Sequence, residues 1–205
     1  MTTDQLTLDD ILDARAYERV RDEFRRQVMA RKRLRRVSVG DIMTLVFESV
    51  DTIRFQVQEM ARVEKIFTDE GIQGELDVYN RLLPSPGELS ATLFIELTTD
   101  ADLRYWLPRL VGVERAVAFE LADGSEVPSI PEGTHADALT REEITPAVHY
   151  LRFPFTPAQV AAFGAGPVAL SVRHPEYRHR TALADGTREV LLGDLEGRTE
   201  PLPLR

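Results

Sequence analysis

The chain has 205 residues, no cysteine and a formal net charge of −9. This length is enough to bury a hydrophobic core as one domain or at most two. Without cysteine the chain has no disulfide, no thiol nucleophile and no thiolate ligand for an iron–sulfur cluster or a zinc ribbon. No apolar run approaches the roughly 18 residues of a membrane helix. The acidic start lacks the basic and apolar segments of a secretory signal, so we expect a cytoplasmic protein with no membrane association.

Charge is unevenly distributed along the chain. Residues 1–36 hold ten Arg and Lys against seven Asp and Glu, whereas the rest holds fifteen against twenty-seven. Such an acidic body argues against non-specific binding to duplex nucleic acid. The basic run Arg31–Arg36 has two interpretations: a solvated helix end that complements the helix dipole, or a patch that binds an anion or nucleic acid. We favour the solvated helix end, because no aromatic residue interleaves the run.

Apolar spacing predicts a first half rich in helices. Residues 52–67 alternate like a strand at first, but an apolar stripe of helical spacing runs further, and Ser49 or Asp51 can cap a helix there. We therefore predict a helix over 52–67. The other elements predicted up to residue 110 are a short turn at 8–12, a long helix at 15–33, strands at 37–39 and 42–48, a loop at 69–71, a helix at 72–83, a strand at 89–97 and a helix after Thr98 that Pro108 interrupts.

The second half is predicted to alternate strands with short helices. Its expected elements are a strand at 115–121 with a return strand through Val127, a loop with a short helical turn at 128–146, a strand at 147–155, a helix at 156–164, a strand at 168–173 and a helix at 187–195. The segment 174–179 is expected to be a loop, and the tail 196–205 is expected to be loose. Together these elements predict a single α+β domain over 1–205, with a mostly antiparallel sheet packed with helices.

The helix predicted over 52–67 offers the first candidate site. Glu59 lies one turn from Phe55 and close to Gln56. A carboxylate beside a ring and an amide can be desolvated, which raises its pKa and suits acid–base catalysis or metal binding. Arg54 and Glu75 are further candidates for the same site. The alternative, which we favour, is a buried polar network that braces the helix.

The histidines offer a second candidate site. His174, Glu176 and His179 are the best combination for a metal, although surface histidines in a loop are common. His149 shares a predicted strand face with Leu151, so we predict it at the edge of the core. The chain has no Gly-rich phosphate loop, no Gly-x-Ser-x-Gly elbow and no His-Glu-x-x-His helix. The sequence therefore indicates no particular cofactor.

Five segments carry a resemblance to a known family. They are Val-Phe-Glu48, Gln56–Met60, Glu75–Asn80, Pro86–Glu96 and Tyr150–Phe153. With them, nearly the whole chain resembles the bacterial family catalogued as domain of unknown function 3501. The resemblance assigns no catalytic residue. It implies a cytoplasmic role linked to redox or oxidative-stress metabolism, because genes of the family neighbour rubrerythrin-like and iron–sulfur oxidoreductase genes.

Three functions follow, in the order in which we favour them. The first is a non-catalytic accessory or interaction protein with a redox protein as its partner. The second is a metal-binding protein or enzyme with a carboxylate-centred site around Glu59. The third is an anion or nucleic-acid binder through Arg31–Arg36, with nucleic acid the less favoured ligand. A homodimer stays open, because no sequence feature indicates or excludes it.

Overall fold

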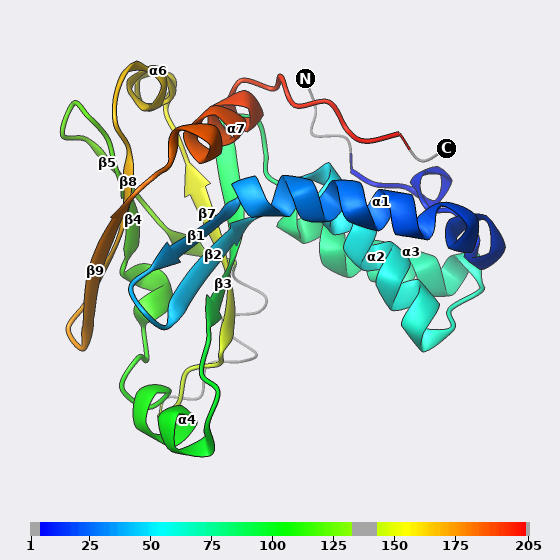
Figure 1. The fold of residues 1–205 in the computed structure, drawn as a ribbon, viewed down its shortest axis with the longest axis horizontal. Helices are drawn as coiled ribbons and strands as arrows, with labels where there is room; N and C mark the ends of the chain where they lie inside the picture. The colour runs from blue at the N-terminus through cyan, green and yellow to red at the C-terminus, as the bar shows by residue number, and fades with distance from the viewer. Residues whose placement is uncertain (1–4, 133–142, 204–205) are drawn as a thin grey trace.

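Two antiparallel sheets form the body of the protein in a computed structural model, which describes residues 5–132 and 143–203 (Figure 1). The first sheet has the order β1 (Arg36–Val39), β2 (Met43–Phe47), β3 (Glu88–Ile95), β7 (Val148–Pro154) and β6 (Ile130–Pro131). The second sheet has the order β5 (Glu126–Pro128), β4 (Val117–Glu120), β8 (Ala169–His174) and β9 (Tyr177–Ala182). The chain is a single α+β domain, which confirms the predicted fold class.

The main hydrophobic core lies between the two sheets. Leu45 and Leu93 from the first sheet belong to the same buried cluster as Phe119 and Leu170 from the second. The ring of Phe119 meets that of Phe153 edge-on, at a centroid distance of 4.9 Å. Helices α6 (Pro157–Ala165) and α7 (Asp185–Leu195) cover one end of this core, and α4 (Asp100–Trp106) lies at the opposite end (Figure 1).

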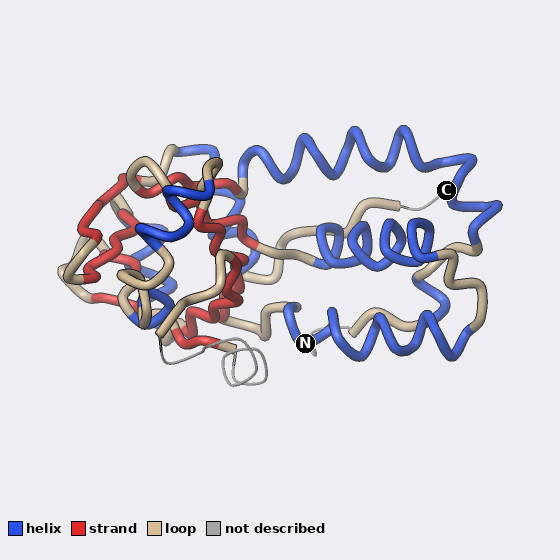
Figure 2. The backbone as a smooth tube through the Cα atoms, turned by 90° about the horizontal axis from the view of Figure 1, so that it is seen from below, coloured by secondary structure: helices blue, strands red, loops and turns tan. Residues whose placement is uncertain are grey.

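Three helices form an arm beside the sheets. They are α1 (Ala14–Leu34), α2 (Val50–Glu64) and α3 (Asp69–Tyr79), and they lie side by side in both views (Figures 1 and 2). Ile53 and Leu76 join α2 to α3 in one apolar cluster, while Phe24 and Phe55 join α1 to α2 in another. Short 3₁₀ turns at 8–10, 80–82 and 113–115 complete the connections.

Local hydrogen bonds explain where the arm helices begin and end. Ser49 and Thr52 form a reciprocal capping box at the start of α2, which confirms the prediction of helix over strand. The helix ends at Glu64, three residues earlier than predicted, because Lys65 takes a left-handed conformation with φ 57°. The loop predicted at 69–71 is wrong. Thr68 caps α3 by accepting a hydrogen bond from the Gly71 N–H.

Two further predictions differ from the structure. The segment 174–179 was expected to be a loop, but its ends belong to β8 and β9, which form a hairpin. The sequence hides β9 because an edge strand can carry charged residues such as Arg178 and Arg180 on its exposed positions. Within the predicted loop 128–146, residues 130–131 form β6 on the edge of the first sheet. Residues 133–142 of that predicted loop lie outside the described ranges, so the short helical turn expected within 128–146 stays a prediction.

The C-terminal tail is held against the arm instead of being loose. It runs between α1 and α2 in Figure 2. Arg31 donates to the Glu200 carbonyl at 2.8 Å, and the Leu202 N–H donates to Asp51 Oδ1 at 2.8 Å. Arg54 also donates to the Leu202 carbonyl. These backbone partners leave no signal in composition, which is why the sequence did not predict them.

No helix in the ranges 5–132 and 143–203 is long and apolar enough to cross a membrane.

Candidate functional site

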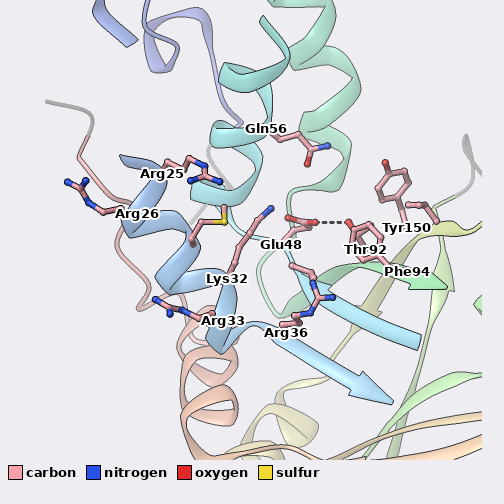
Figure 3. Close-up of a pocket in the computed structure, with 13 residues that line it drawn as sticks. Arg25, Arg26, Lys32, Arg33, Arg36, Glu48, Gln56, Thr92, Phe94 and Tyr150 are labelled. Carbon is pink, nitrogen blue, oxygen red and sulfur yellow. Dashed lines mark hydrogen bonds between the residues drawn. The ribbon is translucent and has the colours of Figure 1, made fainter. Parts of the chain in front are cut away.

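A cavity of about 810 Å³, which we call the basic groove, lies between α1 and the first sheet (Figure 3). Its floor consists of side chains from three neighbouring strands. Val46, Thr92 and Tyr150 stand directly opposite one another across β2, β3 and β7, and Phe94 and Val148 form part of the next row. Because side chains alternate along a strand, the residues between them point to the core on the other face. The groove floor is therefore the second face of the first sheet.

The wall of the basic groove is one face of α1. Arg25, Arg26, Met29, Lys32 and Arg33 line it. They recur at intervals of three and four residues, which places them on the same side of a helix. The opposite side of α1 is apolar and packs against the rest of the arm, so the basic side is left facing the sheet.

Most of the cationic groups in the groove are available to a ligand. The side chains of Arg25, Lys32 and Arg33 form no hydrogen bond or ion pair within the described ranges. Arg26 forms an exposed ion pair with Glu23. Arg36, from the start of β1, completes the cationic lining and forms an ion pair with Glu96. In a protein of net charge −9, this groove concentrates positive charge on one small surface.

Glu48 contributes the one carboxylate of the groove lining. It follows β2 directly and precedes the cap of α2, and it is only 5% exposed. Its Oε1 accepts a hydrogen bond from Thr92 Oγ1 at 2.6 Å, and its Oε2 accepts one from Thr52 Oγ1 at 2.5 Å. A carboxylate has about four acceptor positions, so these two bonds orient Glu48 and leave acceptor capacity unused. Gln56 projects from α2 into the same region (Figure 3).

The basic run Arg31–Arg36 is divided among three environments. Arg35 is 1% exposed and donates two hydrogen bonds to Asp194 of α7, at 2.5 and 2.8 Å. Arg31 pairs with the buried carboxylate of Asp51. Lys32, Arg33 and Arg36 line the basic groove. A uniformly solvated helix end is therefore the wrong description, because three of the five basic residues form ion pairs with distant segments of the chain.

Glu59 does not have the environment expected of an acid–base catalyst. Arg21 donates to its Oε1 at 2.7 Å and its Oε2 at 2.9 Å, and the Tyr17 hydroxyl donates at 2.9 Å. Arg21 is the largest cause that lowers the pKa of Glu59 to about 2, against the opposing effect of burial. The expected rise in pKa is wrong in direction. Glu59 instead joins α2 to α1 through an ion-pair network that also includes Arg62.

The other candidates around Glu59 are dispersed. Gln56 lines the basic groove, whereas Arg54 is buried against Asp51 and the tail. Glu75 belongs to α3, where burial, with a smaller contribution from Glu64, raises its pKa. Neither Glu59 nor Glu75 lines the basic groove, and no hydrogen bond joins them in the described part of the chain.

The residues proposed for a metal lie around the β8–β9 hairpin. His174 is buried, and its Nε2 lies 3.0 Å from the Val111 carbonyl oxygen, while the His179 ring lies tilted against the Tyr177 ring at a centroid distance of 4.3 Å. Glu176 occupies the turn and donates its N–H to His174 Nδ1. Among the residues that the structure describes, no three His, Asp, Glu or Cys side chains are grouped so that they could hold a metal. Metal binding by this set stays a prediction.

His149 is a buried residue of the first sheet, as predicted. It is 8% exposed, and its Nε2 lies 3.1 Å from Thr145 Oγ1. Burial lowers its pKa, while the carboxylate of Glu114 opposes that shift. The neutral, hydrogen-bonded state suits a residue at the edge of the core.

The sequence did not single out the residues that build the basic groove. Two sequence features point to the groove. One is the spacing of Arg25, Met29 and Lys32 on one helix face, and the other is the predicted alternation of β3, which turns Thr92 away from the main core. That alternation is confirmed by the register of β3. What could not be seen is that these two faces lie opposite each other, because about 60 residues separate them in the chain.

The fold and the groove define a class: a single-domain α+β protein with a ligand-sized, cation-lined groove. The chain belongs to the family described as "Protein of unknown function (DUF3501)", whose model matches residues 5–195. It is also similar to the crystal structure of a protein of unknown function from Burkholderia pseudomallei K96243. That similarity has 39% identity and a TM-score of 0.85, and it covers 94% of this chain and 100% of the other. No curated protein matches the chain.

Proposed function

We propose that the protein binds a small anionic molecule in the basic groove. The observation that carries this proposal is the set of cationic side chains along one wall of the groove. Three of them, Arg25, Lys32 and Arg33, form no hydrogen bond or ion pair with another residue in the described ranges. Guanidinium and ammonium groups form strong, charge-assisted hydrogen bonds with phosphate or carboxylate oxygens. Because the rest of the chain is acidic, the groove would attract such an ion while the remaining surface repels it.

The size and lining of the groove favour a small molecule over a polymer. Ligand pockets commonly have volumes of about 300–1,000 Å³ and a mostly apolar lining with a few polar groups. The groove has a volume of about 810 Å³, and Met29, Val46, Phe94 and Val148 supply apolar surface. The ligand should therefore have an apolar or aromatic body attached to its anionic group.

This proposal refines one of the functions expected from the sequence. Anion binding through Arg31–Arg36 is kept for Lys32, Arg33 and Arg36, and extended to Arg25 and Arg26. Nucleic acid stays the less favoured ligand. An accessory role with a redox partner stays a prediction, because neither the family description nor the similar structure names such a partner.

A titration with 1-naphthyl phosphate, an anion with an aromatic body, tests the proposal. We expect saturable binding that weakens as salt is added, and a loss of about tenfold or more in affinity in the double variant Lys32→Ala/Arg33→Ala. The matched control is Arg19→Ala/Arg178→Ala, which removes two exposed cations outside the groove. Equal losses in both variants would show a general charge effect, and the absence of saturable binding of any phosphate with an aromatic body to wild-type protein would refute the proposal.

A further inference from the structure

The basic groove has two chemically different sides. The cations of α1 form one side, whereas Glu48, Gln56, Thr92 and Tyr150 gather on the other (Figure 3). An anionic group is attracted to the α1 side and repelled by the Glu48 carboxylate. A ligand that fills the groove must therefore be asymmetric, with its anion at α1 and a different group at Glu48.

The burial and hydrogen bonds of Glu48 indicate which ligand group should lie next to its carboxylate. Its carboxylate is nearly buried and only accepts hydrogen bonds, and the hydroxyls of Thr52 and Thr92 use part of its capacity. Each Glu48 oxygen already accepts one bond and can accept another, so a donor on the ligand adds a charge-assisted hydrogen bond that an aliphatic chain cannot form. The ligand should thus present a hydrogen-bond donor, such as an amino group, to Glu48. This preference disfavours fatty acids and other simple alkyl anions.

Gln56 and the aromatic side chains of the groove floor further restrict which ligand group fits beside Glu48. The Gln56 side chain makes no hydrogen bond within the described ranges, and its amide offers both a donor and an acceptor. Glutamine amides pair with the donor and acceptor edge of adenine, and carboxylates accept from the amino group of cytosine. Phe94 and Tyr150 supply ring surface on the same side of the groove, on which a flat base can stack.

From this arrangement we infer that the ligand is a nucleoside phosphate whose base carries an exocyclic amine. The base lies on the sheet side with its amine toward Glu48 and its edge toward Gln56, and the phosphate lies among Arg25, Lys32 and Arg33. This inference rests on the proposed function, because it names the ligand class of the same groove.

Calorimetric titration of the full chain with four probes tests the inference. The probes are adenosine 5′-monophosphate, purine riboside 5′-monophosphate, which lacks only the amine, adenosine, which lacks the phosphate, and 1-naphthyl phosphate. We expect adenosine monophosphate to bind about tenfold more tightly than each of the other three.

Two variants test whether the preference for the amine arises from Glu48 and Gln56. Glu48→Gln should reduce the preference for adenosine monophosphate over purine riboside monophosphate, and circular dichroism reports whether it folds. Gln56→Ala, on the partly exposed side of α2, should reduce the same preference and keeps the test open if Glu48→Gln does not fold. Gln73→Ala, exposed on α3, is the matched control and should change nothing.

The outcomes separate the two proposals. If 1-naphthyl phosphate binds as tightly as adenosine monophosphate, or if the amine makes no difference, the nucleotide inference is overturned while anion binding in the groove stands. If no anionic probe binds, both the nucleotide inference and the proposal of anion binding are refuted.

Discussion

Arg21 and Glu59 form a two-bond ion pair that ties α1 to α2, with N–O distances of 2.7 and 2.9 Å. The Tyr17 hydroxyl donates to the same carboxylate, so three groups contributed by two helices meet at one point. This network lies away from the basic groove and fixes the position of α1 relative to the rest of the arm. We therefore expect this network to stabilise the packing of α1 against α2.

Glu59→Gln should lower the free energy of unfolding at about pH 7 by about 1–2 kcal/mol, because it removes the charge that Arg21 pairs with. The folded pKa of Glu59, about 2, lies below an unfolded value of about 4.3. The difference in free energy of unfolding between wild type and Glu59→Gln should therefore be complete above about pH 4.3 and disappear as the pH falls towards 2. Urea unfolding at several pH values measures it. Glu64→Gln, exposed on the same helix, is the control, and an advantage of wild type that grows on acidification would contradict this account.

Replacing Arg35 should be far more damaging than replacing its neighbour Arg33. Arg35→Ala leaves the nearly buried carboxylate of Asp194 without its partner, which costs about 3–5 kcal/mol. Arg33 is exposed, so Arg33→Ala should change stability by less than about 0.5 kcal/mol. Denaturant unfolding measures both. Equal effects of the two substitutions would refute the structural role of the Arg35–Asp194 pair.

The tail contact can be tested without removing the tail. Leu202→Ala should lower stability by about 1 kcal/mol, because the side chain packs against the cluster of Tyr17, Phe24 and Val28. Glu200→Ala should be nearly neutral, since Arg31 bonds to the carbonyl of Glu200 and not to its side chain. Thermal unfolding compares the two variants. A tail that contributes nothing would give the same midpoint for both.

Two glycines should respond to alanine in opposite directions. Gly40 has φ 71°, and a Cβ there would lie 2.2 Å from the Tyr177 hydroxyl, so Gly40→Ala should destabilise the protein by about 1–3 kcal/mol. Gly74 lies in α3 with open space where a Cβ would lie, so Gly74→Ala should stabilise by about 0.5–1 kcal/mol. Unfolding midpoints report both signs. A neutral Gly40→Ala would contradict the close approach of the β8–β9 hairpin to the β1–β2 turn.

Local chemistry explains which parts of the fold could be predicted from the sequence. The helical stripe and the Ser49 cap predicted α2, and the alternation of Leu89 to Ile95 predicted β3. The sequence did not predict β9, because the strand carries charged residues and its stability comes from pairing with β8. For elements of this kind, tertiary pairing outweighs local propensity.

The candidate site was harder to predict, because its chemistry depends on long-range partners. The direction of the Glu59 pKa shift is set by Arg21, 38 residues away, which no local pattern around Phe55 and Gln56 reveals. Gln56 lines the groove, whereas its expected partners Glu59 and Glu75 do not. The groove itself exists only once α1 is placed over the first sheet.

Mapping amide chemical shifts during a titration with 1-naphthyl phosphate tests the central claim most directly, because it locates the bound anion. We predict that the shifts concentrate on α1 between Arg25 and Arg33 and on the floor residues Val46, Thr92 and Tyr150. Shifts confined to other parts of the molecule, or none at saturating ligand, would contradict the basic groove as the binding site.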